Sequence, residues 1–239
     1  MKEILKNIPE CSASEYIGNA HYDTIGLVIS NVDDALLSHM GIGDKYKTIG
    51  IIGSRTGAGA QVQAVDDAVK ATNCKVLSVE IPRDTKGGGG HGVFILIGSN
   101  DVSDAKEAVN MSLELINKNA GELYISSSGH LEVQFTANAG DAVNMAFGAP
   151  KGQAFGFICA CPAPVGLLMA DTAVKSAGVN IVDYRKPSKG TSHSNEIVLL
   201  ISGEASAVKQ AVINAREVGL SLLGTFGADI EVVAPSYLQ

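Results

Sequence analysis

The sequence contains no tryptophan, and only 18% of its 239 residues are charged. The net charge of −7 comes with no cluster of lysine and arginine, which argues against a nucleic-acid-binding surface. The longest apolar runs have the length of strands, so no membrane-spanning helix is expected. Because 46% of the residues are nevertheless hydrophobic, the composition indicates a globular protein whose surface is partly covered by other subunits.

The chain has few cysteines and no secretory signal ahead of them. The four are Cys11, Cys74, Cys159 and Cys161. Their apolar surroundings predict reduced, mostly buried thiols in a cytoplasmic protein. Cys159 and Cys161 would share one face of a strand, but the sequence shows no His or Cys pair to complete a zinc site. We therefore expect no metal and no cofactor.

The strongest positive signal is an internal repeat. The heptapeptide at residues 66–72 recurs at residues 171–177, an offset of 105 residues, and Asp34 recurs as Asp141 at an offset of 107. Small changes of offset are typical of a duplicated domain, because surface loops tolerate gaps that strands and helices do not. The predicted units are a tail at 1–15, a first copy at 16–122 and a second copy at 123–239.

Hydrophobic periodicity predicts the same order of elements in both copies. Expected strands are 24–30, 48–53, 75–81 and 92–98 in the first copy, and 131–137, 155–160, 180–185 and 196–202 in the second. Expected helices are 31–41, with Gly41 as its C-cap, one carrying Val62, Val65 and Val69, one starting near Ser103, 140–147 and 166–177. Two strands in succession at the middle of each copy favour an α+β fold with a mixed or antiparallel sheet.

Two glycine-containing loops invite comparison with phosphate-binding loops. Residues 57–59 lie between a strand and a helix, but the third glycine of a dinucleotide loop is replaced by Val62. The second copy has Pro162-Ala163-Pro164 there, and proline removes the N–H donors that phosphate needs. A strand-to-helix turn and a nucleotide loop both stay open. The run 87–90 lacks the ending of a P-loop and fits either a pore rim or a hairpin tip.

Catalytic residues are not evident. His91 and His193 lie in corresponding loops, but no acid or nucleophile occurs nearby at a repeated spacing. Asp66 and Asp171 are expected on the exposed side of their helices, as solvated or subunit-contacting carboxylates. In the tail, Ile4, Leu5 and Ile8 form one helical stripe before Pro9, which fits a docking peptide or a frayed end.

Several strings give the chain a family resemblance. Together they resemble the tandem-domain shell proteins of bacterial microcompartments for propanediol or ethanol utilisation, from about Cys11 to Tyr237. The strings are residues 55–59, 84–88, 155–158, 171–177, 190–196, 199–203 and 208–211.

The resemblance implies two circularly permuted, ferredoxin-like domains, and a structural protein that is not an enzyme. Three chains would form a flat pseudo-hexamer that tiles with other shell proteins, and lumenal enzymes are possible further partners. Pores would pass a small polar diol, 1,2-propanediol or glycerol, by replacing part of its hydration shell. The competing hypothesis is a trimeric, ferredoxin-like regulatory protein that binds a nucleotide near residues 57–59.

The resemblance also implies where the openings lie. A channel between the two domains of each chain would be lined by Ser54, Arg55, Thr56, His91 and Tyr124. Loops 83–92 and 187–195 would approach the symmetry axis. Their residues of interest are Arg83, Asp84, Thr85, Lys86, Gly87, Gly88, Gly89, Gly90, Lys189, Gly190, Thr191, Ser192, His193, Ser194 and Asn195.

Overall fold

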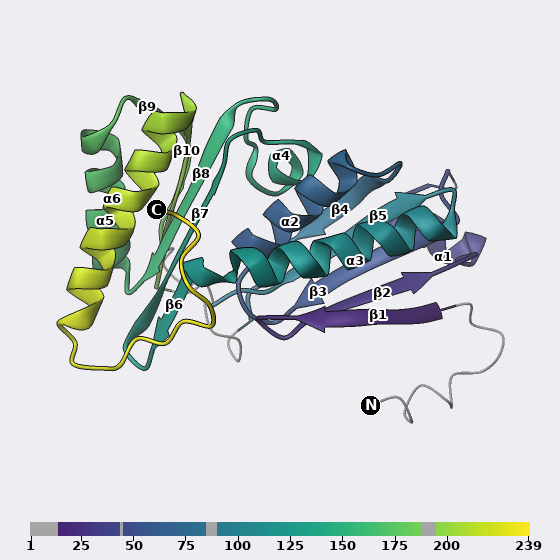
Figure 1. Ribbon diagram of the computed structural model, residues 1–239, viewed down its shortest axis with the longest axis horizontal. Helices are drawn as coiled ribbons and strands as arrows, with labels where there is room; N and C mark the ends of the chain where they lie inside the picture. Colours follow the sequence, from purple (N-terminus) through teal and green to yellow (C-terminus); the bar gives the residue numbers. More distant parts are fainter. Residues whose placement is uncertain (1–13, 44, 85–89, 188–194) are drawn as a thin grey trace.

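The computed structural model describes residues 14–43, 45–84, 90–187 and 195–239. It contains two five-stranded antiparallel sheets of the same topology, which lie side by side (Figure 1). The strand order is β1-β2-β3-β5-β4 in the first sheet and β6-β7-β8-β10-β9 in the second. The α+β class and the duplication are both confirmed.

The elements of the first sheet and its helices are β1 (Ser14–Ala20), β2 (Thr24–Ile29), α1 (Asp34–Met40), β3 (Thr48–Ser54), α2 (Gly59–Lys70), β4 (Lys75–Glu80), β5 (Val93–Ser99) and α3 (Val102–Asn119). A 3-10 turn, η2 (Ala120–Glu122), leads into the second set. That set is β6 (Leu123–Ser126), β7 (Gly129–Thr136), α4 (Asp141–Phe147), β8 (Ala154–Cys161), α5 (Ala163–Ser176), β9 (Val179–Arg185), β10 (Ile197–Gly203) and α6 (Ala205–Gly224).

The short helices α1 and α4 end in the same way. Gly41 and Gly148 both adopt the left-handed conformation, at φ 71° and 70°, and each terminates its helix as the C-cap. The two helices begin differently. Asp33 caps α1 with its own carboxylate, which accepts hydrogen bonds from Ala35 N and Leu36 N. At the corresponding position α4 has Gly140, which offers no side chain.

The sequence-based prediction missed β1 and β6. Strand β1 lies at a sheet edge, is nowhere fully buried and contains a bulge between Tyr16 and Gly18, so its apolar residues do not alternate regularly. Strand β6 has only four residues, too few to show a period of two. Both strands are recruited by pairing with their long neighbours, β2 and β7.

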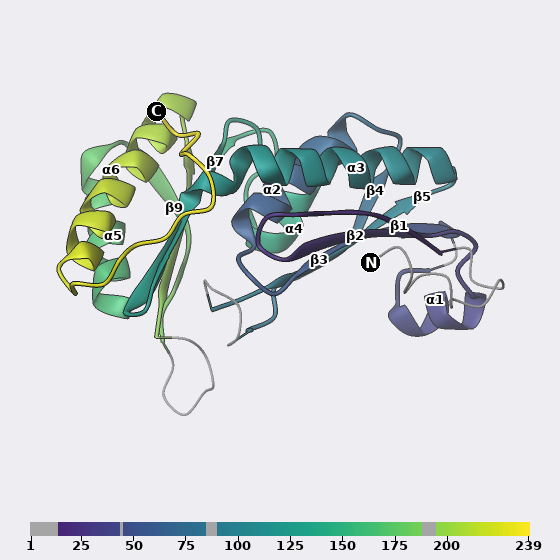
Figure 2. The same cartoon turned by 60° about the horizontal axis from the view of Figure 1, so that its bottom comes forward.

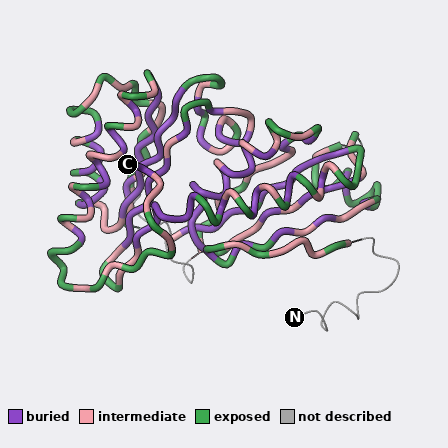
Figure 3. The backbone as a smooth tube through the Cα atoms, in the orientation of Figure 1, coloured by how far each residue is buried: buried purple, intermediate pink, exposed green. Residues whose placement is uncertain are grey.

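One hydrophobic core runs across the junction of the two halves. It joins Val62 of α2 with Val143 and Phe147 of α4, and with Phe155 and Phe157 of β8. The rings of Phe147 and Phe155 stack with centroids 5.6 Å apart. Helix α2 contacts α4 and β7, and α4 contacts β4. The buried segments of Figure 3 accordingly continue from one sheet to the other. A second core lies under α5 and α6.

No helix in the described ranges combines the length and the apolar character that crossing a membrane requires. Cys74 and Cys159 are buried free thiols, and Cys161 is a half-buried one. Cys11 and the tail stripe lie outside the described residues.

Candidate functional site

Asp66 of the first half caps a helix of the second half. Its carboxylate accepts hydrogen bonds from Gly140 N at 2.8 Å, Ala142 N at 2.8 Å and Val143 N at 3.2 Å. Lys70 completes the contact at 2.8 Å. The carboxylate is fully buried, so the expectation of an exposed Asp66 was wrong. The helical period of α2 alone cannot reveal that α4 covers this face.

Glu132 of β7 makes the reciprocal contact with the first half. Its Oε1 accepts hydrogen bonds from Gly59 N at 2.7 Å and Ala58 N at 3.3 Å, at the N-terminus of α2. A carboxylate thus already takes the N–H groups that a nucleotide phosphate would need. This favours the strand-to-helix turn for residues 57–59 and disfavours the nucleotide loop.

The second oxygen of Glu132 binds His91, which lies just before β5. His91 Nε2 and Glu132 Oε2 are 2.9 Å apart, and both side chains are buried. Burial disfavours the imidazolium, but the hydrogen bond and charge of Glu132, with Glu196, outweigh it and raise the pKa of His91. Burial acts against ionisation of Glu132 too, but His91 and the two N–H groups lower the pKa of that carboxyl.

Glu196, just before β10, connects His91 to two more residues of the second half. His130 Nε2 lies 3.1 Å from Glu196 Oε2, and the Cys159 thiol donates to the same oxygen at 3.6 Å. Burial opposes the charge of Glu196, yet the two histidines and Cys159 lower its pKa. Burial, reinforced by the nearby Glu196 and Glu132, raises the pKa of Cys159 well above its ordinary value.

A cavity of about 350 Å³ opens beside this cluster, between the two halves. Its walls include Phe147 and Phe157, while His91 and Glu196 supply polar groups. The full lining is Ala58, Ile81, Arg83, Gly90, His91, Phe147, Phe157, Arg185, Lys186, Glu196 and Val198. An apolar wall with a few convergent polar groups is typical of a site for a small polar molecule.

The predicted channel residues fall into separate environments. His91 lines the cavity. Ser54 and Thr56 surround Gln61, whose Nε2 donates to Ser54 Oγ at 3.2 Å and to the Thr56 carbonyl at 3.0 Å. Arg55 forms an exposed two-pronged ion pair with Asp84, at 2.6 and 2.7 Å.

Tyr124 belongs to a different network. Its hydroxyl donates to Glu122 at 3.4 Å, and Arg216 Nη1 lies 3.3 Å from the same carboxylate. Burial and Glu122 raise the pKa of Tyr124 to about 12. Arg216 and Ser236 tie this network to the C-terminal segment through Leu238, so it anchors the chain end.

The predicted axis loops are described only in part. Arg83 and Gly90 line the cavity, and Asn195 is exposed. The remaining predicted residues other than Asp84 lie outside the described residues: Thr85, Lys86, Gly87, Gly88, Gly89, Lys189, Gly190, Thr191, Ser192, His193 and Ser194.

Sequence reasoning missed Glu132, Cys159 and Glu196 as site residues. The available signal was a glutamate inside an apolar strand, where the first copy has Ile25 at the corresponding position. A charge within a buried strand is rarely tolerated without a partner, so it marks a site.

Comparison with known proteins places the chain in a family. A family model described as "BMC domain" matches twice, at residues 48–128 and 154–233. A curated relative, the "Bacterial microcompartment shell protein PduB" of Citrobacter freundii, is 53% identical over 228 residues, covering 95% of this chain and 84% of the relative.

Two solved structures have a closely similar fold. One is described as a trimeric bacterial microcompartment shell protein PduB; it has a TM-score of 0.87 and 48% identity, over 93% of this chain and 99% of the other. EtuB from Clostridium kluyveri has a TM-score of 0.88 and 48% identity, over 93% of this chain and 97% of the other.

Proposed function

This chain belongs to the BMC-domain family and is a structural shell protein of a bacterial microcompartment, and on that premise we propose how it assembles and what it passes. Three copies close into a flat ring, and the cavity between the two domains of each copy admits a small polar diol. The observation that carries the assembly is that surfaces buried at the junction inside the chain are exposed at the repeat-related positions.

Helix α2 and its repeat α5 show this difference along one stripe. At an offset of 105 residues, Val62 is 0% exposed while Leu167 is 55% exposed. One turn later, Asp66 is buried while Asp171 lies open to solvent. Strands β4 and β9 extend the pattern, because Val76 is 9% exposed and its counterpart Ile181 56%. We call the exposed stripe Pro164, Leu167, Asp171 and Ile181 the α5 face.

Helix α4 and its repeat α1 show the complementary difference. At an offset of 107 residues, Val143 is 2% exposed and Leu36 53%. Phe147 is likewise buried while Met40 is exposed. Inside the chain α4 covers α2, so the same contact between chains would set α1 against α5. We call the surface formed by Ile25, Leu36 and Met40 the α1 face.

The chemistry at the two junctions changes in matched pairs. Inside the chain, Glu132 accepts hydrogen bonds from Gly59 N. The repeat-related positions hold Ile25 and Pro164, so an apolar side chain would meet a residue without an N–H donor. A carboxylate facing Pro164 would lose its donor, and an isoleucine facing Gly59 would leave that N–H unpaired. The paired change supports contact between Ile25 and Pro164 of two different chains.

The α1 and α5 faces are different surfaces of one chain, so their contact is head-to-tail. Figure 2 shows α1 at one end of the molecule and α5 at the other. Head-to-tail contacts produce a closed ring or an open filament, depending on the rotation between copies. A ring of three, with six domains, is supported by the solved relative that is described as trimeric.

The cavity supports the transport part of the proposal. Its volume of about 350 Å³ exceeds that of a three-carbon diol, and Glu196 and His91 offer hydrogen-bonding groups to hydroxyls. These groups would replace part of the diol's hydration shell, whereas a less polar aldehyde would gain less. Loops 83–92 and 187–195 would then border the symmetry axis. Ser54, Arg55, Thr56 and Tyr124 remain candidates around the path.

Other shell proteins are the proposed edge partners of the ring, and enzymes of the lumen are proposed contacts of its inner face. A regulatory, nucleotide-binding role is not favoured, because Glu132 occupies the N–H groups of residues 58 and 59.

Sedimentation velocity tests the ring. Leu167→Asp on the α5 face and Leu36→Asp on the α1 face should each convert trimers to monomers, because a buried unpaired carboxylate opposes association. Phe226→Asp is the matched control, since Phe226 is exposed and lies on neither face. Trimers that survive both substitutions would overturn the assignment of the faces.

Crystals soaked in 1,2-propanediol test the channel. We expect diol between the two domains of each chain, against His91 and Glu196, and loss of that diol in His91→Phe. Diol found solely at the three-fold axis would instead assign the path to the central loops.

A further inference from the structure

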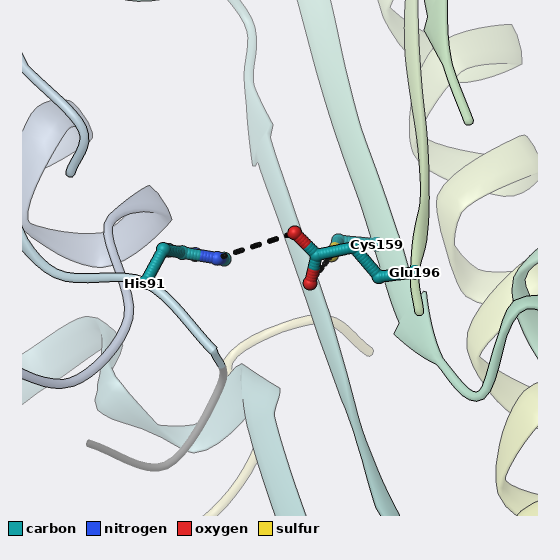
Figure 4. A group of neighbouring side chains, drawn as sticks. All are labelled: His91, Cys159 and Glu196. Carbon is teal, nitrogen blue, oxygen red and sulfur yellow. Dashed lines mark hydrogen bonds and ion pairs between the residues drawn. The ribbon is translucent and has the colours of Figure 1, made fainter. Parts of the chain in front are cut away.

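We infer that His91, Cys159 and Glu196 form a binding site for a zinc-like divalent transition-metal ion at the junction of the two domains. One potential ligand atom from each residue lies within 4.8 Å of the other two. Figure 4 shows His91 reaching from one domain toward Cys159 and Glu196 of the other. The site depends neither on the ring nor on diol transport.

The distances approach those of a tetrahedral zinc centre. Zinc bond lengths to nitrogen, oxygen and sulfur imply ligand-to-ligand separations of about 3.4–3.6 Å. Cys159 Sγ lies 3.6 Å from Glu196 Oε2, and His91 Nδ1 lies 4.0 Å from Glu196 Oε1. A small rotation of the His91 ring and the Glu196 carboxylate brings the three atoms around one ion.

The surrounding carboxylate and histidine already orient two of the ligands. Glu132 Oε2 bonds His91 Nε2, which fixes a proton on that nitrogen and leaves the Nδ1 lone pair directed at Glu196. A carboxylate behind a histidine is the usual outer partner of a metal-bound imidazole. His130 holds Glu196 Oε2 at 3.1 Å in the same way.

His91 Nδ1 is not otherwise used. Its 4.0 Å separation from Glu196 Oε1 exceeds hydrogen-bond distance, so this nitrogen is buried and faces an acceptor that it does not reach. An ion between the two atoms would satisfy both. Binding forms a metal–sulfur bond and breaks the S–H bond of Cys159, whose proton leaves to solvent through the cavity. A thiolate, a carboxylate and a neutral imidazole then balance a divalent charge to within one unit.

The adjoining cavity gives the site both access and a fourth ligand position. His91 and Glu196 line it, so an ion can enter from that side and take a water molecule or a hydroxyl from a small solute. Three protein ligands with one open position is the arrangement of zinc sites that act on small molecules. The sequence did not indicate this site because its ligands come from two domains and carry no characteristic spacing.

Cobalt binding by the purified full chain, after removal of metals with a chelator, tests the inference. Co²⁺ should bind with one ion per chain and give the charge-transfer absorption of a thiolate ligand. Cys159→Ser should abolish this absorption, whereas Cys161→Ser, two residues along the same strand, should keep it. Glu132→Gln should weaken Co²⁺ binding about 10–100-fold, as expected for an outer partner of a ligand.

Near-UV circular dichroism keeps these outcomes separate from misfolding, and only variants with the spectrum of the parent chain are compared. A chain that binds no Co²⁺, or one in which Cys161→Ser and not Cys159→Ser removes the absorption, overturns the inference. Zn²⁺ should displace Co²⁺ from the same site; failure to compete would also count against it.

Discussion

Helices α2 and α5 carry nearly the same sequence around an aspartate and a lysine, yet the two aspartates have opposite surroundings. Asp66 is buried against the N-terminus of α4, whereas Asp171 forms an ion pair with Lys175 in solvent. The helices themselves are alike, and the difference lies in what packs on them. A surface exposed in one repeat and buried in the other thus reports a missing neighbour.

Asp66→Ala should produce the largest effect on stability. It removes a cap with three N–H donors and leaves Lys70 without its buried partner, so we expect a loss of at least about 2 kcal/mol in the free energy of unfolding. Urea denaturation measures it. Asp171→Ala is the repeat-matched control and should change the monomer by about 0.5 kcal/mol or less. Equal losses would contradict the difference between the two helices.

Exchanging the junction chemistry should have the next largest effect. Ile25→Glu alone should weaken trimers, because its carboxylate would face Pro164. Adding Pro164→Gly restores an N–H donor, so the two changes should be coupled by about 1–2 kcal/mol in trimer dissociation. Concentration-dependent sedimentation of the four variants in the cycle measures this coupling. Simple additivity would show that the two residues do not meet.

The paired C-caps should give a smaller and equal effect. Gly41 and Gly148 both have positive φ and open space around the missing side chain. Gly41→Ala and Gly148→Ala should therefore each cost about 1 kcal/mol in the free energy of unfolding, from left-handed strain alone. Thermal unfolding at matched protein concentration measures both. A clearly larger cost at Gly148 would mean that the cap also serves the buried junction.

The His91–Glu132 pair should make the smallest contribution, because burial offsets its attraction. The stabilisation from His91 is present below its ordinary pKa of 6.5 and is lost as pH rises through the raised folded value. That from Glu132 is present above 4.5 and is lost as pH falls through the lowered folded value. The difference in unfolding free energy between parent and His91→Gln should thus peak between pH 4.5 and 6.5.

Urea unfolding across pH 4 to 9 measures that difference, and His21→Gln, at an exposed histidine, is the control. A difference that grows steadily above pH 7 would assign the wrong charge state to the pair.

Local signals in the sequence were enough to predict most of the fold. Asp34 and Gly41 bound a helix because caps act within a few residues, and eight strands follow from alternating or continuous apolar runs. The duplication also follows from sequence, since it is a direct comparison of two segments. Edge strand β1 gave no such signal, because its pairing partner and not its own pattern defines it.

The site was far less predictable than the fold. His91 was expected near a channel and does line the cavity, but its partners Glu132 and Glu196 are 41 and more residues away in the sequence. Asp66 was placed on the wrong side of its helix for the same reason. Contacts between domains leave no periodicity in either segment, so only the repeat-to-repeat difference hinted at them.

The cap that Glu132 places on α2 has a consequence for how the chain is made. Gly59 and Glu132 are separated by 73 residues, and synthesis proceeds from the N-terminus at a limited rate. The first domain therefore emerges from the ribosome with the amides of α2 uncapped and its apolar stripe uncovered. It must wait for β7 and α4 before its own structure is complete. During that interval the growing chain exposes the same kind of surface that later recruits a neighbouring subunit.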